Sequence, residues 1–396
     1  MTAPTGIAAA NIHGSTIHSL LSLLNENLLG ARLHSLQTAL QSVRLLIIDE
    51  YSFLSTAMFD TLDRQLRTIF PANTDCPFGA LNIVLCGDPA QLAPVCGRPV
   101  YAITTNNYSP SSFHLFDTVI ELDQPFRQTG NNETQTRFRE LLSHIANCDA
   151  CETDWTWLQS RRPANLSHAE NDMFDNAKYI VSTNKTCDSL NRDRLATLAP
   201  VMRIENTDDN LHEYNSDLFE EDPFLHTGPQ LYAVGAQVML TANLWTEAGL
   251  VNGSCGTIVH ILKPTDNRNR QVIMVDFPEY HGPALSPLHP TVLPITQVCA
   301  GNSKGMPLTL AWAITIHKSQ GMTLQHATVN IGEKEFASGL SFVALSRCKT
   351  FHSLRIQPFD FPRLQRIEKG QLVKARQHEL THLRELASAT TTCQTC

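Results

Sequence analysis

The first third of the chain alternates short apolar runs with stretches of helical periodicity. Apolar runs occupy residues 45–48 and 82–86, whereas residues 16–24 and 56–70 repeat apolar side chains at helical spacing. Strands that are apolar throughout, with helices between them, are typical of a parallel sheet with both faces covered. The pattern therefore predicts an α/β unit in this part of the chain.

A second α/β unit is predicted beyond a connecting helix at residues 137–146. Its strands are expected at residues 179–181, 309–315 and 327–331. The sequence before its last two strands changes character, because β-rich runs follow one another closely and Asn252-Gly253 marks a turn. These runs are residues 237–240, 256–262 and 271–277. We interpret them as a small antiparallel β-barrel inserted into the second unit.

The remaining segments are polar or helical. Residues 205–222 hold eight acidic side chains and no Lys or Arg, which predicts a solvated loop. A C-terminal helix is expected at residues 363–386, and residues 387–396 are expected to fray. The expected domains are 1–128 for the first, incomplete α/β unit, 129–176 for a helical connector, 177–234 with 301–362 for the second unit, 235–300 for the barrel and 363–396 for the C-terminal helix and tail.

Composition excludes several classes of protein. With 42% hydrophobic residues the 396-residue chain is not disordered, and no apolar run approaches the roughly 20 residues of a membrane helix. A net charge of −8 gives no overall basic field, although a local groove can still be basic. Eleven scattered cysteines indicate reduced thiols in an intracellular compartment, for which we expect the nucleus or mitochondrion, although no targeting signal is visible. Cys148/Cys151 and Cys393/Cys396 have zinc-knuckle spacing, but free thiols are the simpler interpretation.

Chemistry-bearing residues follow both predicted strands of the first unit. Asp49 and Glu50 end the first strand, where open α/β sheets bind ligands, so Asp49 is placed to ligate Mg²⁺ and Glu50 to activate a water. Acids after a strand also simply begin turns or cap helices. The second strand ends in Gly-Asp-Pro-Ala-Gln, where the amide of Gln91 is suited to sensing a γ-phosphate.

Two arginines are candidates for stabilising charge on phosphate. Arg127 lies in a polar segment between the two α/β units, and Arg347 follows Ser-Phe-Val-Ala-Leu-Ser in the second. Each is weak evidence alone, because a surface arginine is usually only a solvated charge.

Taken together, the motifs resemble the Pif-type DNA helicases, the RecD-related 5′-to-3′ branch of helicase superfamily one. The matching blocks, in the order of the family, are Thr-Gly-Ile-Ala-Ala with Thr-Ile-His (residues 5–18), Ile-Ile-Asp-Glu (47–50), Gly-Asp-Pro-Ala-Gln-Leu-Ala-Pro-Val (87–95), Phe-Arg-Gln (126–128), His-Lys-Ser-Gln-Gly-Met-Thr-Leu (317–324) and Val-Ala-Leu-Ser-Arg (343–347). They span nearly the whole chain. A cellular and a transposon-encoded origin both fit the resemblance.

The resemblance implies two RecA-like domains with ATP between them and single-stranded DNA across their tops. It makes Asp49 the magnesium ligand, Glu50 the catalytic acid/base, Gln91 the γ-phosphate sensor, and Arg127 and Arg347 the arginine fingers, with Gly321 also in the nucleotide-coupling block. DNA contact is implied for the blocks that hold Thr5, Gly6, His18, Asn184, Lys185, His317, Ser319, Gln320 and Thr323. The barrel entry matches at residues 249–256.

These roles agree with the residue types. Hydroxyls, amides and backbone N–H groups suit sequence-independent contacts with phosphates. Trp312 is a candidate stacking platform for a base, but its Ala/Ile-rich surroundings favour the core. The implied partners are single-stranded DNA and duplex junctions, and the implied roles are repair, recombination or telomere maintenance.

One departure from the family is large. The phosphate-binding loop Gly-x-x-x-x-Gly-Lys-Ser/Thr is missing, since no lysine follows a glycine, and the match begins at the block that normally lies beyond this loop. Without its N–H groups and lysine, the β- and γ-phosphates lose their main anchor. We therefore expect this chain to hydrolyse ATP poorly. The opening strand that leads into this loop in the family is missing as well, so we also expect the remaining strands to expose apolar edges and faces and the chain to aggregate.

Three interpretations remain open. The first is a truncated copy of an ATP-dependent helicase, or a truncated gene model of one. The second is a non-catalytic relative that binds only single-stranded DNA or a partner. The third is an ATPase that takes its phosphate-binding loop from a separate chain.

Overall fold

The computed structural model describes most of the chain. The described residues are 1–21, 30–95, 97–102, 112–198, 200–204, 230–262, 271–300, 303–365 and 371–394. They form two compact units, Met1–Ser182 with Ser319–Cys396 and Thr183–Lys318. Within these described ranges, no helix is both long and apolar enough to cross a bilayer.

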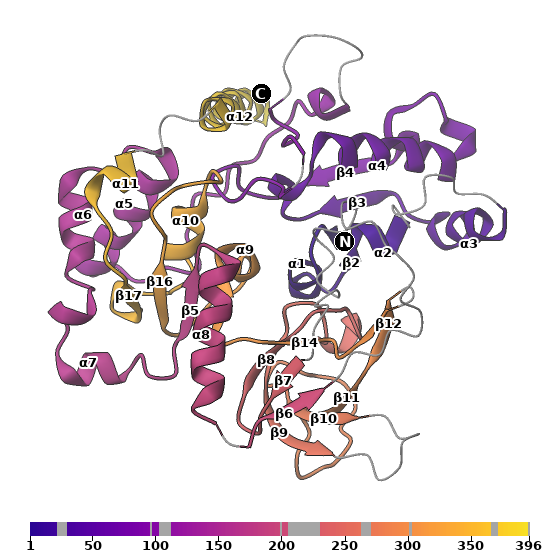
Figure 1. The fold of residues 1–396 in the computed structure, drawn as a ribbon. Helices are drawn as coiled ribbons and strands as arrows, with labels where there is room; N and C mark the ends of the chain where they lie inside the picture. The colour runs from indigo at the N-terminus through magenta and orange to yellow at the C-terminus, as the bar shows by residue number, and fades with distance from the viewer. Residues whose placement is uncertain are drawn as a thin grey trace, which may run out of the picture. The chain divides into compact units, whose positions relative to one another are not determined.

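The first unit begins with a parallel sheet in the order β2-β1-β3-β4 (Figure 1). Its strands are β1 (Thr2–Ala3), β2 (Ser15–Thr16), β3 (Leu45–Ile48) and β4 (Asn82–Leu85). The helix α4 (Thr56–Ile69) starts at Ser55, whose hydroxyl accepts a hydrogen bond from the backbone N–H of Met58 at 3.2 Å. Its buried apolar positions recur at helical spacing and pack in one core with Ile48 of β3. The predicted strands and helix of this unit are therefore confirmed.

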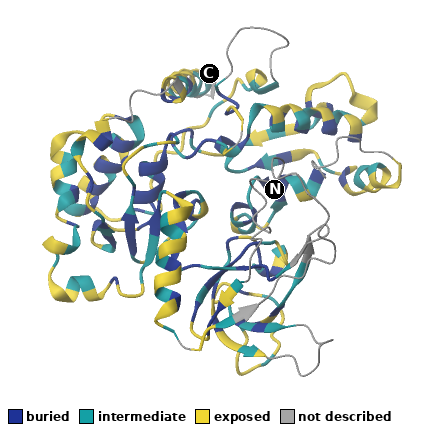
Figure 2. Ribbon diagram, viewed as in Figure 1, coloured by how far each residue is buried: buried dark blue, intermediate teal, exposed yellow. Residues whose placement is uncertain are grey.

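A second parallel arrangement lies in the same unit. It contains β5 (Lys178–Val181), β16 (Ala327–Asn330) and β17 (Leu354–Ile356), with β16 between the other two. Figure 2 shows much of β5 and β16 in the colour of buried residues. The connecting helix α5 (Glu133–Asn147) contacts α10 (Leu340–Leu345), so the expected connector helix is also present. The parallel strands confirm the predicted α/β class.

The other helices of this unit are short, except the last. They are α1 (Gly6–Asn11), α2 (Ile17–Leu21), α3 (Gly30–Leu40), α6 (Glu152–Gln159), α7 (His168–Asp172), α11 (Phe361–Gln365) and α12 (Gln371–Gln394). The prediction of a frayed tail is wrong for residues 387–394, because α12 continues to Gln394. The apolar helical spacing ends at residue 386, but residues 387–394 contain no Gly or Pro, so the backbone hydrogen bonds of the helix can propagate through them.

The second unit is dominated by antiparallel pairing. Its five-stranded sheet has the order β11-β10-β9-β8-β14. The strands are β8 (Gln237–Leu240), β9 (Cys255–Leu262), β10 (Val272–Asp276), β11 (Val292–Thr296) and β14 (Leu308–Leu310). The expected runs are thus strands, whereas their closure into a barrel stays a prediction.

The remaining elements of this unit are smaller. They are α8 (Asn184–Ala196), β6 (Met202–Ile204), β7 (Gln230–Tyr232), β12 (Val298–Ala300), β13 (Ser303–Gly305) and β15 (Ala313–Thr315), and α9 (Ile316–Ser319) follows β15. The single strand expected at residues 309–315 is two strands, β14 and β15. Trp312 between them is partly buried against the core of the antiparallel sheet, which favours the core interpretation. The acidic segment 205–222 lies outside the described residues.

One edge of the first sheet is apolar and accessible. Among the described strands β4 pairs with β3 alone, and Val84 of β4 is 42% exposed. Parallel strands are normally covered on both faces, so this exposure is unusual. Ile120, Leu122 and Phe126, in the segment that leads to Arg127, are also highly exposed. The expected exposure of apolar strand surface is therefore observed.

Candidate active site

The carboxyl end of β3 carries the two acidic residues. The backbone N–H of Asp49 donates to the carbonyl of Thr2 at 2.9 Å, which fixes the chain as it leaves the strand. Glu50 has a φ of 53° and a ψ of 45°, a left-handed conformation that is uncommon for a residue with a side chain. Its N–H donates to Asp49 Oδ1 at 2.9 Å. Such strained residues cluster at functional sites, and here the strained residue directly follows Asp49, so that two neighbouring carboxylates leave one strand end.

The loop after β4 lies beside this strand end. The backbone N–H of Tyr51 donates to the carbonyl of Cys86 at 3.0 Å, which ties the two strand ends together. Gly87 is required here, because a Cβ on it would lie 2.8 Å from the Tyr51 ring. Asp88 Oδ1 accepts from the Ala90 N–H at 2.8 Å, and the Gln91 side chain is hydrogen-bonded to the same carboxylate. Gln91 is therefore held by Asp88.

Gln320 comes from a distant part of the sequence to Glu50. Its Nε2 donates to Glu50 Oε2 at 3.0 Å, and both residues belong to the first unit. Burial raises the pKa of Glu50, and the charges of Asp49 and Asp88 raise it further, while the Gln320 hydrogen bond lowers it. A carboxylate with a raised pKa beside a strand end is a good candidate for a general base.

The two candidate arginines lie in the same cluster. Arg127 Nε donates to Thr323 Oγ1 at 3.0 Å. Arg347 is buried, and its guanidinium donates to the carbonyl of Val343 at 2.8 Å and to Ser346 Oγ at 2.7 Å. Burial lowers the pKa of Arg347, the charge of Arg127 lowers it further, and Glu50 and Asp88 oppose that change. The charges of Arg127, Arg347, Glu50 and Asp88 therefore influence one another's pKa values.

The structure thus brings together residues from five separate motifs. They are Asp49, Glu50, Asp88, Gln91, Arg127, Gln320, Thr323 and Arg347. Carboxylates able to hold a cation and activate water stand beside guanidinium groups able to stabilise phosphate charge. This combination suits phosphoryl transfer.

A magnesium ion fits the donor set. Asp49 and Asp88 both act electrostatically on Glu50, and the mutual repulsion of such carboxylates is relieved by a divalent cation. No group of three or more metal-ligating side chains occurs among the residues that the structure describes. Mg²⁺ is commonly bound through one or two carboxylates, with water and substrate phosphates completing its octahedron. A single carboxylate such as that of Asp49 is therefore compatible with Mg²⁺ binding.

The residues expected to contact DNA are distributed over both units. Thr5 caps α1, its hydroxyl accepting from the Ala8 N–H at 3.3 Å, and Gly6 is buried in the first turn. His18 is half-buried in α2, and burial lowers its pKa. Of the later block, Ser319 is fully buried, and Gly321 has a φ of +79°, where a Cβ would lie 3.2 Å from the side chain of Ile7 of α1. Gly321 therefore packs two motifs against each other.

The other expected DNA contacts belong to the second unit. Asn184 and Lys185 are exposed at the start of α8, whose cap is the hydroxyl of Thr183. His317 is partly buried in α9. Exposed amide and ammonium groups at a helix start are suited to phosphate contacts.

Sequence reasoning gave no role to three residues of the site, which are Asp88, described above, Gln128 and Arg376. Gln128 is buried, and its Nε2 donates to the carbonyls of Ser346 and Cys348, both at 3.0 Å, on either side of Arg347. Its place in Phe-Arg-Gln was an available signal. Arg376 of α12 lies near Asp88, and its isolated position in a helical tail gave no signal.

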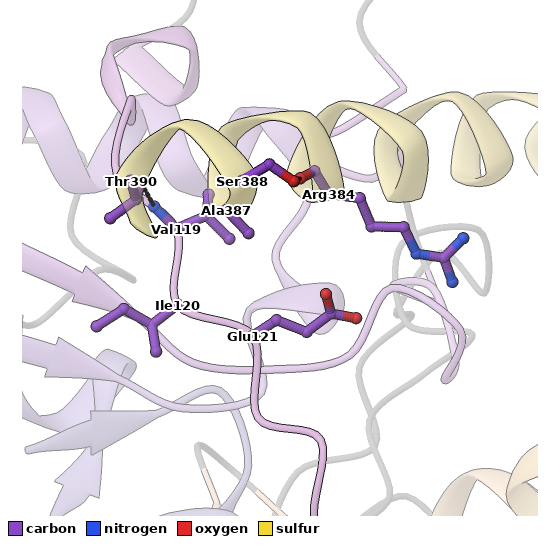
Figure 3. Close-up of a pocket in the computed structure, with 7 residues that line it drawn as sticks. All are labelled: Val119, Ile120, Glu121, Arg384, Ala387, Ser388 and Thr390. Atoms are coloured by element: carbon purple, nitrogen blue, oxygen red, sulfur yellow. Dashed lines mark hydrogen bonds between the residues drawn. The ribbon is translucent and has the colours of Figure 1, made fainter. Parts of the chain in front are cut away.

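A pocket of about 510 Å³ lies elsewhere in the first unit. Residues 119–121 line it together with Arg384, Ala387, Ser388 and Thr390 of α12, as Figure 3 shows. The N–H of Val119 donates to Thr390 Oγ1 at 3.3 Å across one side. None of the motif residues lines this pocket, so it is separate from the cluster of catalytic candidates.

Comparison with known proteins is consistent with this geometry. Residues 1–154 match the model of the family described as PIF1-like helicase. The human ATP-dependent DNA helicase PIF1 is 30% identical over 374 residues, which cover 91% of this chain and 54% of that protein. The chain therefore spans about half the length of this curated relative.

Solved structures of similar fold include two helicases. The crystal structure of Pif1 helicase from Candida albicans has a TM-score of 0.72 and 25% identity, covering 96% of this chain and 88% of that one. Pif1 helicase from Bacteroides in complex with ADP-AlF3 and single-stranded DNA has a TM-score of 0.71 and 25% identity, covering 96% and 87% of the two chains. The two parallel-sheet parts of this chain are thus similar to the RecA-like folds of those helicases.

Proposed function

Because the chain belongs to the PIF1-like helicase family, we propose that it forms the motor core of an ATP-dependent DNA helicase. The observation that carries the proposal is the contact of Gln320 Nε2 with Glu50 Oε2 at 3.0 Å. This contact directly connects the candidate general base with a block of residues that is expected to contact DNA. Such a contact gives DNA binding a short physical route to the hydrolytic residue.

Each residue of the cluster has a proposed role in hydrolysis. Asp49 would hold Mg²⁺, which supplies charge neutralisation on the β- and γ-phosphates. Glu50 orients and deprotonates the attacking water, and Gln91 senses the γ-phosphate. Arg127 and Arg347 stabilise the charge that develops on the transferred phosphoryl group.

The proposed substrates are ATP, single-stranded DNA and duplex junctions. The Bacteroides relative was solved with ADP-AlF3 and single-stranded DNA, which supports both ligand classes. ATP binding would close the two RecA-like parts and hydrolysis would reopen them, so that alternating grip advances the protein 5′ to 3′. Repair, recombination and telomere maintenance are processes that such an activity serves.

The direction of movement has its own test. In any form of the protein that turns ATP over, streptavidin bound to a biotin at the 3′ end of an oligonucleotide should be displaced, whereas streptavidin at the 5′ end should remain. Displacement from the 5′ end alone would contradict the proposed direction.

The 396-residue chain alone should hydrolyse ATP slowly, because it contains no Gly-Lys dipeptide and so has no phosphate-binding loop of the family's type. The test is ATP hydrolysis by this chain with and without single-stranded DNA, with Glu50→Gln as the matched variant. The proposal predicts a low rate that rises with DNA and disappears in Glu50→Gln. A rate that is the same in both proteins would remove Glu50 from the mechanism, and a rate of about 10 s⁻¹, ordinary for an enzyme, would refute the need for the loop.

The absence of a Gly-Lys dipeptide also favours a second function, non-catalytic binding of single-stranded DNA or a partner. The buried Arg347 supports this alternative, because its guanidinium donates to the carbonyl of Val343 and the hydroxyl of Ser346. Under this alternative, Glu50→Gln leaves both DNA affinity and the biological effect unchanged. Under the motor proposal, the biological effect is lost while DNA affinity remains.

A further inference from the structure

A single arginine of the C-terminal helix lies among the segments that carry the catalytic candidates. Arg376 of α12 is only 1% exposed. Its Nη1 donates to Ser338 Oγ at 3.0 Å and, over 3.4 Å, to the carbonyl of Ala90. Its Nη2 donates to the carbonyl of Ala146 at 2.8 Å and to Cys148 Sγ at 2.8 Å. One guanidinium therefore bonds the loop after β4, the segment before α10 and the end of α5.

The positive charge of Arg376 is compensated by a nearby carboxylate. A buried arginine needs partners for its charge and its donors, and both Nη atoms of Arg376 have acceptors, whereas its Nε has none among the described residues. Asp88 supplies the charge, because the attraction of Arg376 lowers the pKa of Asp88 against the effect of burial. Asp88 in turn bonds the Gln91 side chain. The candidate γ-phosphate sensor is thus held by a carboxylate whose counter-charge comes from α12.

A glycine next to Ser338 brings the same two segments into close contact. Gly339 has a φ of +88°, and a Cβ on it would lie 2.6 Å from the carbonyl oxygen of Gln91 and 2.7 Å from that of Ala90. Gly339 is the N-terminal cap of α10, which leads directly to Ser346 and Arg347. The backbone of the sensor loop therefore touches the start of the helix that positions an arginine candidate. Arg376 bonds both sides of this contact.

We propose that Arg376 is a positioning residue that holds the loop of Asp88 and Gln91 against the segment of Ser338 and Gly339, and thereby fixes Gln91 relative to Arg347. Arg376 itself touches no reacting atom in this scheme. An effect of Arg376 on phosphoryl transfer rests on the proposed function. The link that Arg376 makes between the two segments rests only on its hydrogen bonds to Ala90 and Ser338. α12 is then a part of the motor rather than an appendage to it.

Hydrogen exchange in the complete 396-residue chain tests this link without needing ATP turnover. In Arg376→Ala, the amides of residues 86–92 and 338–347 should exchange about tenfold faster, because both segments lose hydrogen bonds to a charged group. Arg376→Lys keeps the charge and most of the stem, so it should restore part of the protection. Arg384→Ala, an exposed arginine of the same helix, should change neither segment.

A second variant separates loss of the Arg376 hydrogen bonds from local detachment of α12. Ser338→Ala removes one acceptor but keeps Arg376 and the helix, and it should speed exchange at residues 86–92 while α12 stays protected. Unchanged exchange at residues 86–92 in both Arg376→Ala and Ser338→Ala would overturn the proposal. Faster exchange in these variants, in a chain that fails to bind single-stranded DNA, would keep the positioning role and refute the proposed function instead.

Discussion

Gln320 donates a hydrogen bond of 3.0 Å to the carboxylate of Glu50, although the two residues are 270 positions apart in the chain. Gln320 is buried, and its Oε1 has no hydrogen-bond partner within the described part of the chain. Its amide is therefore oriented by Glu50. A change in the position of the block that holds Gln320 would be transmitted to the candidate general base.

The first prediction concerns the pKa of Glu50. Gln320→Ala removes a donor that favours the ionised carboxylate, so the pKa of Glu50 should rise further above its ordinary value. Carboxyl carbon-13 NMR, with the Glu50 signal assigned from Glu50→Gln, measures this shift. Gln124→Ala, at an exposed position, is the control. A Glu50 titration that is the same in Gln320→Ala and the wild type would contradict the coupling.

The two arginine candidates should differ in their contribution to stability. Arg127 is partly exposed and its guanidinium donates to Thr323, so Arg127→Ala should cost under about 1 kcal/mol of unfolding free energy. The guanidinium of Arg347 is buried and donates to the carbonyl of Val343 and the hydroxyl of Ser346, so its replacement by Ala should cost about 1.5–3 kcal/mol.

Urea unfolding of the two variants measures this difference. Equal losses of stability would show that Arg347 is not fixed by its own segment. In any form of the protein that turns ATP over, either replacement should slow hydrolysis by about 10³–10⁵-fold if the residue acts as an arginine finger. DNA affinity should be retained in both variants.

Glu379 of α12 should make stability depend on pH. Burial raises the pKa of this carboxyl from its ordinary 4.5 to about 7. The folded chain therefore holds the proton more tightly than the unfolded chain, and stability from this group is lost as the pH rises from about 4.5 to about 7. Glu379→Gln should remove this loss and raise stability by up to roughly 3 kcal/mol at about pH 8, with little effect at about pH 4.

Thermal unfolding at several pH values tests the prediction. Glu385→Gln, an exposed acid on the same helix, should leave the pH profile unchanged. A profile of Glu379→Gln that is parallel to that of the wild type would mean that Glu379 is already ionised without cost.

The exposed edge of the first sheet should promote self-association. Val84 is 42% exposed on β4, and an accessible apolar edge strand is a template for pairing with another chain. Val84→Thr keeps a β-branched side chain but adds a hydroxyl, so it should lower association measured by light scattering at increasing concentration. Asn82→Thr, on the same strand at a position that is already polar, is the control. Equal scattering from Val84→Thr and the wild type would exclude this edge as the cause.

The sequence allowed the local elements around the site to be predicted. The apolar runs at residues 45–48 and 82–86 are β3 and β4, and their parallel pairing brings Asp49 and Asp88 to the same edge of the sheet. Helical periodicity likewise predicted α4, because one face of that helix is buried against the sheet.

Contacts between distant residues could not be predicted from periodicity. The bond between Gln320 and Glu50 depends on how the chain returns to the first unit, which no local pattern encodes. Arg376 is similar, because a lone arginine in a helical tail looks like a solvated charge until its neighbours are known. The break between β14 and β15 was missed since the apolar run passes through Ala311 and Trp312 without a turn signal.

The central claim, that this chain carries the single-stranded-DNA-binding core of a helicase, is tested most directly by equilibrium binding to single-stranded DNA. Fluorescence anisotropy of a labelled oligothymidylate should show saturable binding by the 396-residue chain. Its affinity should fall with salt at a slope of about −0.7 per phosphate contacted, and a blunt duplex of equal length should bind more weakly. No binding to the single strand at low salt, or equal affinity for the blunt duplex, would contradict the account.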